Sequence, residues 1–97
     1  VNVMIIINAK LKVAAEHREA YLSLMKDLVD ATQQEPGNLF YHHYEDVTEP
    51  NSFVVVENYR NQQAVDAHNK SAHFKVFSDN IGKYVSEQPV IDVAEVK

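Results

Sequence analysis

Residues 39–59 read "LFYHHYEDVTEPNSFVVVENY", and this stretch decides the fold. Its two ends, "LFYHHYED" (39–46) and "FVVVENY" (53–59), are rich in the aromatic and β-branched residues that favour β-strands. The polar segment between them, "VTEPNS", contains proline, asparagine and serine, which are typical of turns. The stretch therefore predicts an antiparallel β-hairpin with a longer loop.

The alternation of side chains along these two strands predicts a sheet that is apolar on both faces. One face is expected to carry alternate residues of both strands, namely Leu39, Tyr41, His43 and Glu45 with Phe53, Val55, Glu57 and Tyr59. The opposite face would then carry Phe40, His42, Tyr44, Val54 and Val56. Helices can cover only one face, and an uncovered apolar face of this kind marks an interface. We therefore expect a homodimer formed sheet against sheet.

The segments before the hairpin predict a strand and a helix. Residues 3–13, "VMIIINAKLKV", begin as a continuous apolar run and then alternate, as in a strand that is half buried toward its end. From Glu16 the apolar residues recur at helical spacing, in the stripe Tyr21, Met25, Leu28 and Thr32. The sequence "EPG" (35–37) should end this helix, since proline cannot continue it and glycine allows a left-handed turn.

After the hairpin the pattern indicates a divided helix and a last strand. Asn61 and Ser71 are both predicted helix N-caps, so the second helical region is expected to break at Ser71. Residues 90–96, "VIDVAEV", follow Pro89 and have the composition of a strand. The order is then β-α-β-β-α-β, which predicts an α+β, ferredoxin-like fold with an antiparallel sheet and helices on one face.

Length and composition restrict the classes of function. Ninety-seven residues predict a single domain, residues 1–97. Nine basic and fourteen acidic residues give a net charge of −5 with no basic run, which argues against binding of nucleic acid or of membrane surfaces. The chain has no cysteine, so disulfides and thiolate chemistry are excluded. No apolar run reaches the length of a membrane span, and a cytoplasmic protein is expected.

The stretch "DAHNKSAHFKVF" (66–77) contains the most suggestive polar residues, His68 and His73. On a continuous helix this spacing would turn the two rings about 140° apart, and a break at Ser71 removes even that relation. No metal site is therefore expected. A histidine that lines an apolar pocket could instead move a proton on or off a phenol or an enol. The alternatives are that His68 interacts with a helix dipole and that His73 faces solvent.

Two further polar residues interrupt apolar strands. His43 is expected on the helix-covered face, where it needs a hydrogen-bond partner such as Tyr59 or Glu57, or else lines a cavity. Asn8 stands within the apolar run "MIIINA" (4–9). In a pocket it could hold a substrate oxygen or dioxygen, whereas at a strand edge it would only satisfy backbone groups.

Three stretches in this order resemble the antibiotic biosynthesis monooxygenase family: "EPGNLFYHHYED" (35–46), "NSFVVVENY" (51–59) and "AVDAHNKSAHFK" (64–75). In that family a Glu-Glu/Pro-Gly turn leads into the second strand, and the next strand ends Glu-x-Trp/Tyr, here Glu57-Asn58-Tyr59. The following helix carries His-x-x-Ser/Thr-x-His-Phe/Tyr, here with His68, Ser71, His73 and Phe74. The resemblance covers nearly the whole chain and implies a dimeric α/β barrel.

The resemblance implies a cofactor-independent oxygenase that acts on quinols or other electron-rich phenols. Removing a proton from such a substrate makes a carbanion-like species that can itself pass an electron to dioxygen. The protein then supplies a dry pocket, a base and hydrogen-bond donors for the developing oxyanion. In this hypothesis His43 or His68 is the base and Asn8 holds oxygen. The substrate-binding residues would be Tyr41, Glu57, Tyr59, His73, Phe74 and Phe77.

Other branches of the family leave alternatives open. Haem-degrading relatives use a tryptophan on the broken helix, but this chain has none, and Ser78 stands near the expected axial position. Another branch isomerises a small phosphorylated signalling sugar, for which Lys10, Lys70 and Lys75 are the candidate phosphate-binding residues. A third reading is a dimeric ligand-binding or stress-response protein that keeps the barrel without the chemistry.

Overall fold

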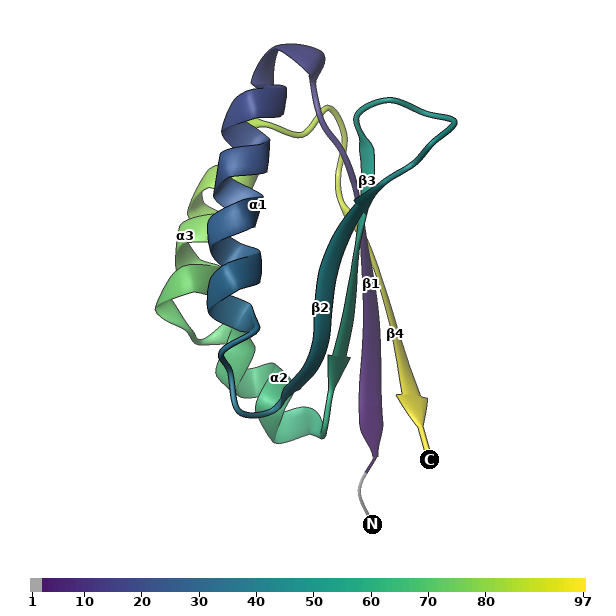
Figure 1. Cartoon of the computed structure of the whole chain (residues 1–97), viewed down its shortest axis with the longest axis vertical. Coiled ribbons are helices and arrows are strands. Elements are labelled where there is room, and N and C mark those ends of the chain that lie inside the picture. Colours follow the sequence, from purple (N-terminus) through teal and green to yellow (C-terminus); the bar gives the residue numbers. More distant parts are fainter. Residues whose placement is uncertain (1–2) are drawn as a thin grey trace.

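A computed structural model describes residues 3–97, which form a four-stranded antiparallel sheet with helices on one face (Figure 1). The strands β1 (Met4–Lys12), β2 (Asn38–Glu45), β3 (Ser52–Tyr59) and β4 (Val90–Val96) lie in the order β2-β3-β1-β4. The helices are α1 (Arg18–Thr32), α2 (Gln62–Asn69) and α3 (Ala72–Asn80), with short 3-10 turns at Ala15–His17 and Ile81–Lys83. The predicted ferredoxin-like α+β fold is confirmed, with the second helical region divided into α2 and α3.

The hairpin of β2 and β3 has the predicted alternation of side chains. On β3 the residues of one face, Phe53, Val55, Glu57 and Tyr59, are all buried, and those between them are only partly buried. Leu39 is an exception on β2, because the pairing with β3 is irregular between Asn38 and Phe40. Its side chain is 55% exposed, so the expectation that it lies with Tyr41 on the covered face was wrong.

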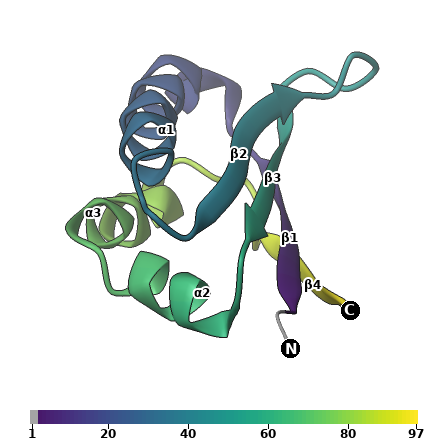
Figure 2. The same cartoon turned by 60° about the horizontal axis from the view of Figure 1, so that its bottom comes forward.

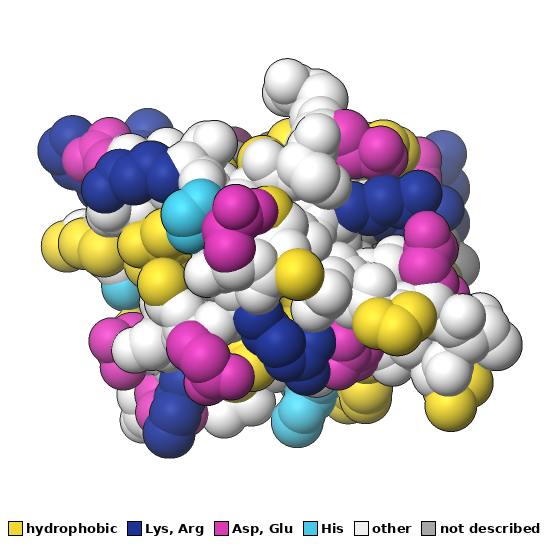
Figure 3. Space-filling view, turned by 90° about the horizontal axis from the view of Figure 1, so that it is seen from above, with side chains coloured by type: hydrophobic (Ala, Val, Ile, Leu, Met, Phe, Trp, Pro, Cys, Tyr) yellow, Lys and Arg dark blue, Asp and Glu magenta, His cyan; other side chains and the backbone are white. Residues whose placement is uncertain are grey.

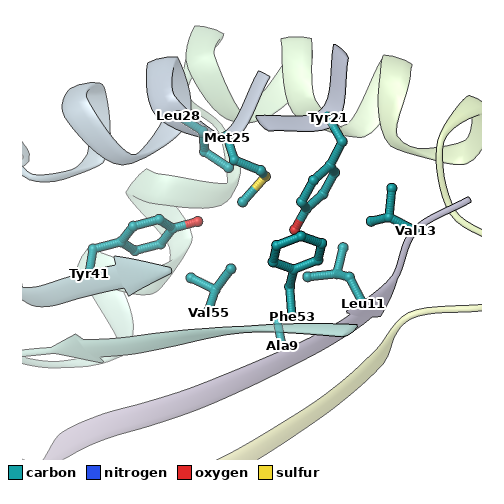
Figure 4. Packing of buried hydrophobic residues seen from close by; sticks show 9 residues of the cluster. All are labelled: Ala9, Leu11, Val13, Tyr21, Met25, Leu28, Tyr41, Phe53 and Val55. Atoms are coloured by element: carbon teal, nitrogen blue, oxygen red, sulfur yellow. The ribbon is translucent and has the colours of Figure 1, made fainter. Parts of the chain in front are cut away.

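The main core lies between α1 and the sheet. The buried residues of α1 are Tyr21, Met25, Leu28 and Thr32, which is the stripe that the helical spacing predicted. Figure 4 shows Tyr21, Met25 and Leu28 facing Tyr41, Phe53 and Val55 of the hairpin, with Leu11 and Val13 of the first strand segment beside them. The helical period of α1 and the two-residue period of the strands therefore meet in one apolar layer.

The turn after α1 differs from the expectation in one respect. α1 ends at Thr32, before Pro36, but Gly37 does not have the left-handed backbone that the sequence suggested. Glycine is required there for another reason: a Cβ atom on Gly37 would lie 2.3 Å from the Cβ atom of Ala64 in α2. The α1–β2 turn thus approaches α2 closely, and the backbone N–H of Arg60 also donates to the carbonyl of Gly37 (3.0 Å).

Both predicted N-caps are confirmed. The side chain of Asn61 accepts a hydrogen bond from the backbone N–H of Ala64 (2.9 Å) at the start of α2. The hydroxyl of Ser71 accepts one from the N–H of Phe74 (3.2 Å) at the start of α3. The chain therefore turns at Ser71, and Figure 2 shows α2 and α3 meeting at an angle on the same side of the sheet as α1.

The sheet face that points away from the helices has no covering element among residues 3–97 (Figure 1). Its partly buried or exposed side chains include Ile6, Phe40, Tyr44, Val54 and Val56. At the end of the molecule formed by the start of α1 and the β2–β3 loop, basic and acidic side chains are interspersed (Figure 3). No helix in the described part of the chain is long and apolar enough to cross a membrane.

The close contact at Gly37 gives a test of the packing between the α1–β2 turn and α2. Gly37→Ala should lower the free energy of unfolding by about 1–3 kcal/mol, because its new methyl group overlaps Ala64. Gly82→Ala is the matched control, since nothing lies within 4 Å of its added Cβ atom. The midpoints of denaturant unfolding measure both, and a Gly37→Ala protein as stable as the parent would contradict the contact.

Candidate functional site

A cavity of about 420 Å³ lies between the helix-facing side of the sheet and helices α2 and α3. Its walls are mainly apolar and come from β1, β3, α3 and β4, with Ile7, Phe74, Phe77 and Val93 among them. The cavity is open along the edge strand β4, whose residues are all exposed. Its polar lining is small and includes Tyr41, Glu57 and His68, an arrangement typical of small-molecule sites.

Glu57 is a buried carboxyl group on the cavity wall. It is 7% exposed, and its Oε1 atom accepts a hydrogen bond from the hydroxyl of Tyr59 (2.8 Å). Burial raises the pKa of Glu57 to about 7, an effect that the Tyr59 hydrogen bond opposes and the negative charge of Glu35 reinforces. A large fraction of Glu57 is therefore protonated near neutral pH, and the side chain can donate or accept a proton there.

His68 is held rigidly at the end of α2. It is 3% exposed, and its ring packs against those of Tyr41, Tyr59 and Phe74 with centroids 5.1–5.6 Å away. Its Nδ1 atom donates a hydrogen bond to Oε2 of Glu35 (2.9 Å), which leaves Nε2 as the ring nitrogen available to the cavity. Burial lowers the pKa of His68, although Glu35 opposes this, so the ring is a neutral acceptor near pH 7.

Glu35 is the site residue that the sequence analysis missed. Its Oε2 atom binds both His68 and His73, the latter through Nε2 at 2.5 Å. The argument that the break at Ser71 separates the two histidines was wrong, because the turn there brings both rings to one carboxylate. The only signal was the position of Glu35 in "EPG", since no helical or strand spacing relates residue 35 to residues 68 and 73.

His43 lies away from this cavity. Its Nε2 atom is hydrogen-bonded with the hydroxyl of Tyr21 (2.8 Å), and its ring stacks on Phe53 at 4.9 Å. The partner is therefore on α1, and neither Tyr59 nor Glu57 fills that role. Burial lowers the pKa of His43, as expected for a partly buried histidine. The structure gives it a packing contact with α1 and no access to the cavity.

Asn8 also lies outside the cavity. Its neighbours Ile7 and Ala9 line the cavity, and successive side chains of a strand point to opposite faces. Asn8 therefore belongs to the uncovered face of the sheet, where it pairs in register with Val56 and Asp92. The oxygen-holding role expected for this residue has no support from the geometry of the chain.

The remaining predicted site residues divide into two groups. Tyr41, Phe74 and Phe77 line the cavity together with Glu57 and His68. Tyr59 and His73 lie behind these residues, where Tyr59 supports Glu57 and His73 supports Glu35. Two of the expected substrate contacts are thus supporting residues in the structure.

A second hollow, of about 480 Å³, lies beside the β2–β3 loop. It is lined by Lys10 and Lys12 among acidic side chains, and Lys12 pairs with Glu49 (3.5 Å) while Lys10 pairs with Asp92 (3.4 Å). None of the histidines borders it. We therefore take the cavity at His68 and Glu57 as the candidate site.

Comparison with known proteins shows the family to which the chain belongs. The antibiotic biosynthesis monooxygenase family matches residues 4–80, and the chain belongs to this family. It is 40% identical over 74 residues to a protein of Bacillus subtilis (strain 168) named "Putative monooxygenase YcnE". The matched residues make up 76% of this chain and 78% of that protein. The resemblance in the three sequence stretches is thus confirmed at the level of the family.

Solved structures share the fold over nearly the whole chain. A protein from Caulobacter crescentus CB15 described as a "putative antibiotic biosynthesis monooxygenase" has 27% sequence identity and a TM-score of 0.93, with 99% of this chain and 92% of that chain covered. A conserved protein from Methanosarcina mazei also has a TM-score of 0.93 at 24% identity, and the match covers 98% and 94% of the two chains. At that identity the second match shows the fold alone.

The burial of Glu57 predicts a specific dependence of stability on pH. Because the folded-state pKa is raised to about 7, Glu57 contributes most to stability when it is protonated at low pH, and this contribution is lost as pH rises through 7. Glu57→Gln keeps a neutral side chain of similar shape. The free energy of unfolding of this variant should therefore rise relative to the parent between pH 5 and pH 8.

Urea unfolding at a series of pH values measures this difference, and the exposed Glu16→Gln is the matched control. A difference between parent and Glu57→Gln that stays constant from pH 5 to pH 8 would show that Glu57 titrates as an ordinary surface carboxyl group.

Proposed function

We propose that this chain is a cofactor-independent monooxygenase that oxidises a small quinol-like or phenol-like aromatic with dioxygen. The observation that carries the proposal is the meeting of two groups on one apolar cavity. His68 offers an unprotonated ring nitrogen held in place by Glu35, and Glu57 offers a carboxyl group with a pKa of about 7. A positioned base and a positioned acid are what a proton-coupled oxidation needs in a site of this kind.

The lining of the cavity favours a neutral aromatic substrate. Phe74, Phe77 and Tyr41 present aromatic surfaces, and aliphatic residues of the sheet fill the rest of the wall. No lysine or arginine is among the lining residues in the described part of the chain. A phosphorylated substrate would require cations, so a ring that carries hydroxyl groups fits this surface better than a sugar phosphate does.

The proposed reaction needs no external reductant. Nε2 of His68 takes the proton of a substrate hydroxyl, and the resulting anion passes one electron to dioxygen. The ring radical and superoxide then combine at a ring carbon, and the peroxide formed takes up a proton. Its O–O bond breaks with loss of water as the ring C–H proton leaves, so a hydroquinone and O₂ give a hydroxyquinone and H₂O. Glu57 and the Tyr41 hydroxyl are the donors for the negative oxygen in this sequence.

Isomerisation of a small oxygenated metabolite is the second candidate. A base and an acid on one cavity are also what a proton transfer between neighbouring carbon atoms requires, and Glu57 with His68 would supply them. The three lysines considered for a phosphate, Lys10, Lys70 and Lys75, are all absent from the cavity lining. Because none of these lysines lines the cavity, isomerisation of a phosphorylated substrate fits the cavity less well than the proposed oxidation does.

Oxygen uptake with a panel of hydroquinones, in buffer containing a metal chelator, tests the oxygenase. His68→Gln should lower kcat/KM at least 100-fold, in line with the usual contribution of a general base of about 10²–10⁴. His17→Gln is the control, since the His17 ring packs against Tyr84 at a tilt and does not line the cavity. If the parent consumes no oxygen with any hydroquinone, or if His68→Gln retains full activity, the assignment fails.

We also propose that the chain acts as a homodimer joined through the uncovered sheet face. This face carries apolar side chains of β1, β2 and β3 without a covering element, while the helices occupy the other side. Burial of such a surface against a second copy is favourable at about 25 cal/mol per Å² of apolar area, and a small domain gains most from it. A face-to-face pair of sheets leaves both cavities on the outer, helix-covered sides.

Val56 and Val76 provide a matched pair of substitutions for the dimer. Val56 lies on the uncovered face, whereas Val76 is 54% exposed on α3. Sedimentation velocity at micromolar concentration should show a dimer for the parent and for Val76→Glu, and a monomer for Val56→Glu, because a buried unpaired charge is costly. A parent protein that sediments as a monomer would contradict the proposed interface.

A further inference from the structure

We propose that Glu35, His68 and His73 form a binding site for a divalent transition-metal ion such as Zn²⁺. This inference is independent of the proposed oxygenase, and its starting point is a geometric one. The carboxylate oxygen, Nδ1 of His68 and Nε2 of His73 all lie within 4.8 Å of one another. Two imidazoles and one carboxylate are a frequent set of protein ligands for zinc and for other first-row metals.

The two carboxylate oxygens of Glu35 differ in their hydrogen bonding, and this difference favours a bound cation. Oε2 is hydrogen-bonded with both imidazoles, at 2.9 Å from Nδ1 of His68 and 2.5 Å from Nε2 of His73. Oε1 is buried and has no hydrogen-bond partner among the described residues. A buried carboxylate oxygen without a partner costs free energy. A cation placed between the three side chains would interact with this oxygen as well as with both rings.

The three donors need only a small rearrangement to hold an ion. Zinc binds nitrogen and oxygen ligands at about 2.0–2.2 Å, so neighbouring ligands of a tetrahedral site are about 3.4 Å apart. The two imidazole nitrogens would therefore move outward from Oε2 by about 0.5–0.9 Å and toward each other from a separation of at most 4.8 Å, shifts that side-chain rotation can provide. The fourth position would be taken by water or by Oε1.

The surroundings hold the ligands in place and leave a path to solvent. His68 is fixed by the rings of Tyr41 and Phe74, and its backbone carbonyl accepts a hydrogen bond from the Ser71 hydroxyl (2.6 Å). Supporting contacts of this kind orient metal ligands. The side chains of Glu35 and His73 are 14% and 25% exposed, so an ion can enter from the surface beside α3.

The ion would lie outside the cavity. Glu35 and His73 do not line it, and His68 would bind the ion through Nδ1 while Nε2 remains on the cavity side. No step of the proposed oxidation passes through the ion. Occupancy would nevertheless replace the Glu35–His68 hydrogen bond, so the metal-bound and metal-free forms present His68 to the cavity in different electrostatic surroundings.

Titration of the full chain with Co²⁺ and Zn²⁺ tests this site. The protein should be prepared without a histidine tag and stripped with a chelator. We expect one equivalent of Co²⁺ to give the visible absorption bands of a nitrogen-coordinated ion, and Zn²⁺ to displace it with a submicromolar Kd measured against a chromophoric chelator. His73→Ala and Glu35→Gln should each weaken Zn²⁺ binding at least tenfold.

His42→Ala and His17→Ala are the matched controls, because neither residue belongs to the cluster, and both should bind Zn²⁺ like the parent. Circular dichroism checks that each variant is folded. Should His73→Ala fail to fold, Glu35→Gln decides, since it keeps the shape of the side chain. The absence of stoichiometric binding, or binding that persists unchanged in the folded variants, would overturn the proposal.

Discussion

The turn at Ser71 is the constraint on which the site depends. One continuous helix would direct His68 and His73 to different sides, and only one of them could face the sheet. The Ser71 cap instead ends α2 and starts α3 in a new direction. His68 is then buried against aromatic rings, while His73 reaches back to the same carboxylate from outside. The Ser71 hydroxyl accepts from the N–H of Phe74 and donates to the carbonyl of His68, so it stabilises the turn that brings the polar groups of the site together.

The position of β4 explains why a cavity exists in so small a domain. α1 packs against β2 and α3, and α2 packs against β1 and β3, whereas the residues of the edge strand β4 are all exposed. Ile91 and Val93 therefore remain 56% and 61% exposed although they point to the helix side of the sheet. Apolar surface that a larger helix would have filled is left as the rim of the cavity. A ligand with an apolar body would cover this surface when it binds.

Much of the fold follows from local patterns in the sequence. The stripe on α1, both N-caps and the alternation on β3 were predictable, because each depends on spacing within one segment. The exposure of Leu39 was not predictable, because the irregular pairing at Asn38 and Phe40 depends on how two strands meet. Gly37 was expected in a turn for the freedom of its backbone, yet what requires glycine there is the proximity of α2.

The site was less predictable than the fold, because its contacts join segments that are far apart in the sequence. His68 was expected at the cavity because of the resemblance to the family, whose helix motif it matches, and the structure places it there. Glu35 is separated from its two partners by more than thirty residues, and the contact arises only when the α1–β2 turn packs beside α3. His43 has the alternation of an inward residue, but the alternation does not tell which helix lies above it. The structure shows that its partner is Tyr21 of α1, so the partly buried ring lies under α1 and away from the cavity.

The contact between Gly37 and Ala64 has a consequence for variation at this site. The two backbones approach so closely that neither position can gain volume unless the other loses it. Substitutions at residues 37 and 64 are therefore epistatic, and drift at one position is restricted by the residue present at the other. Glu35 lies two residues before Gly37, so a substitution that displaces this turn would also displace the carboxylate that binds the two imidazoles.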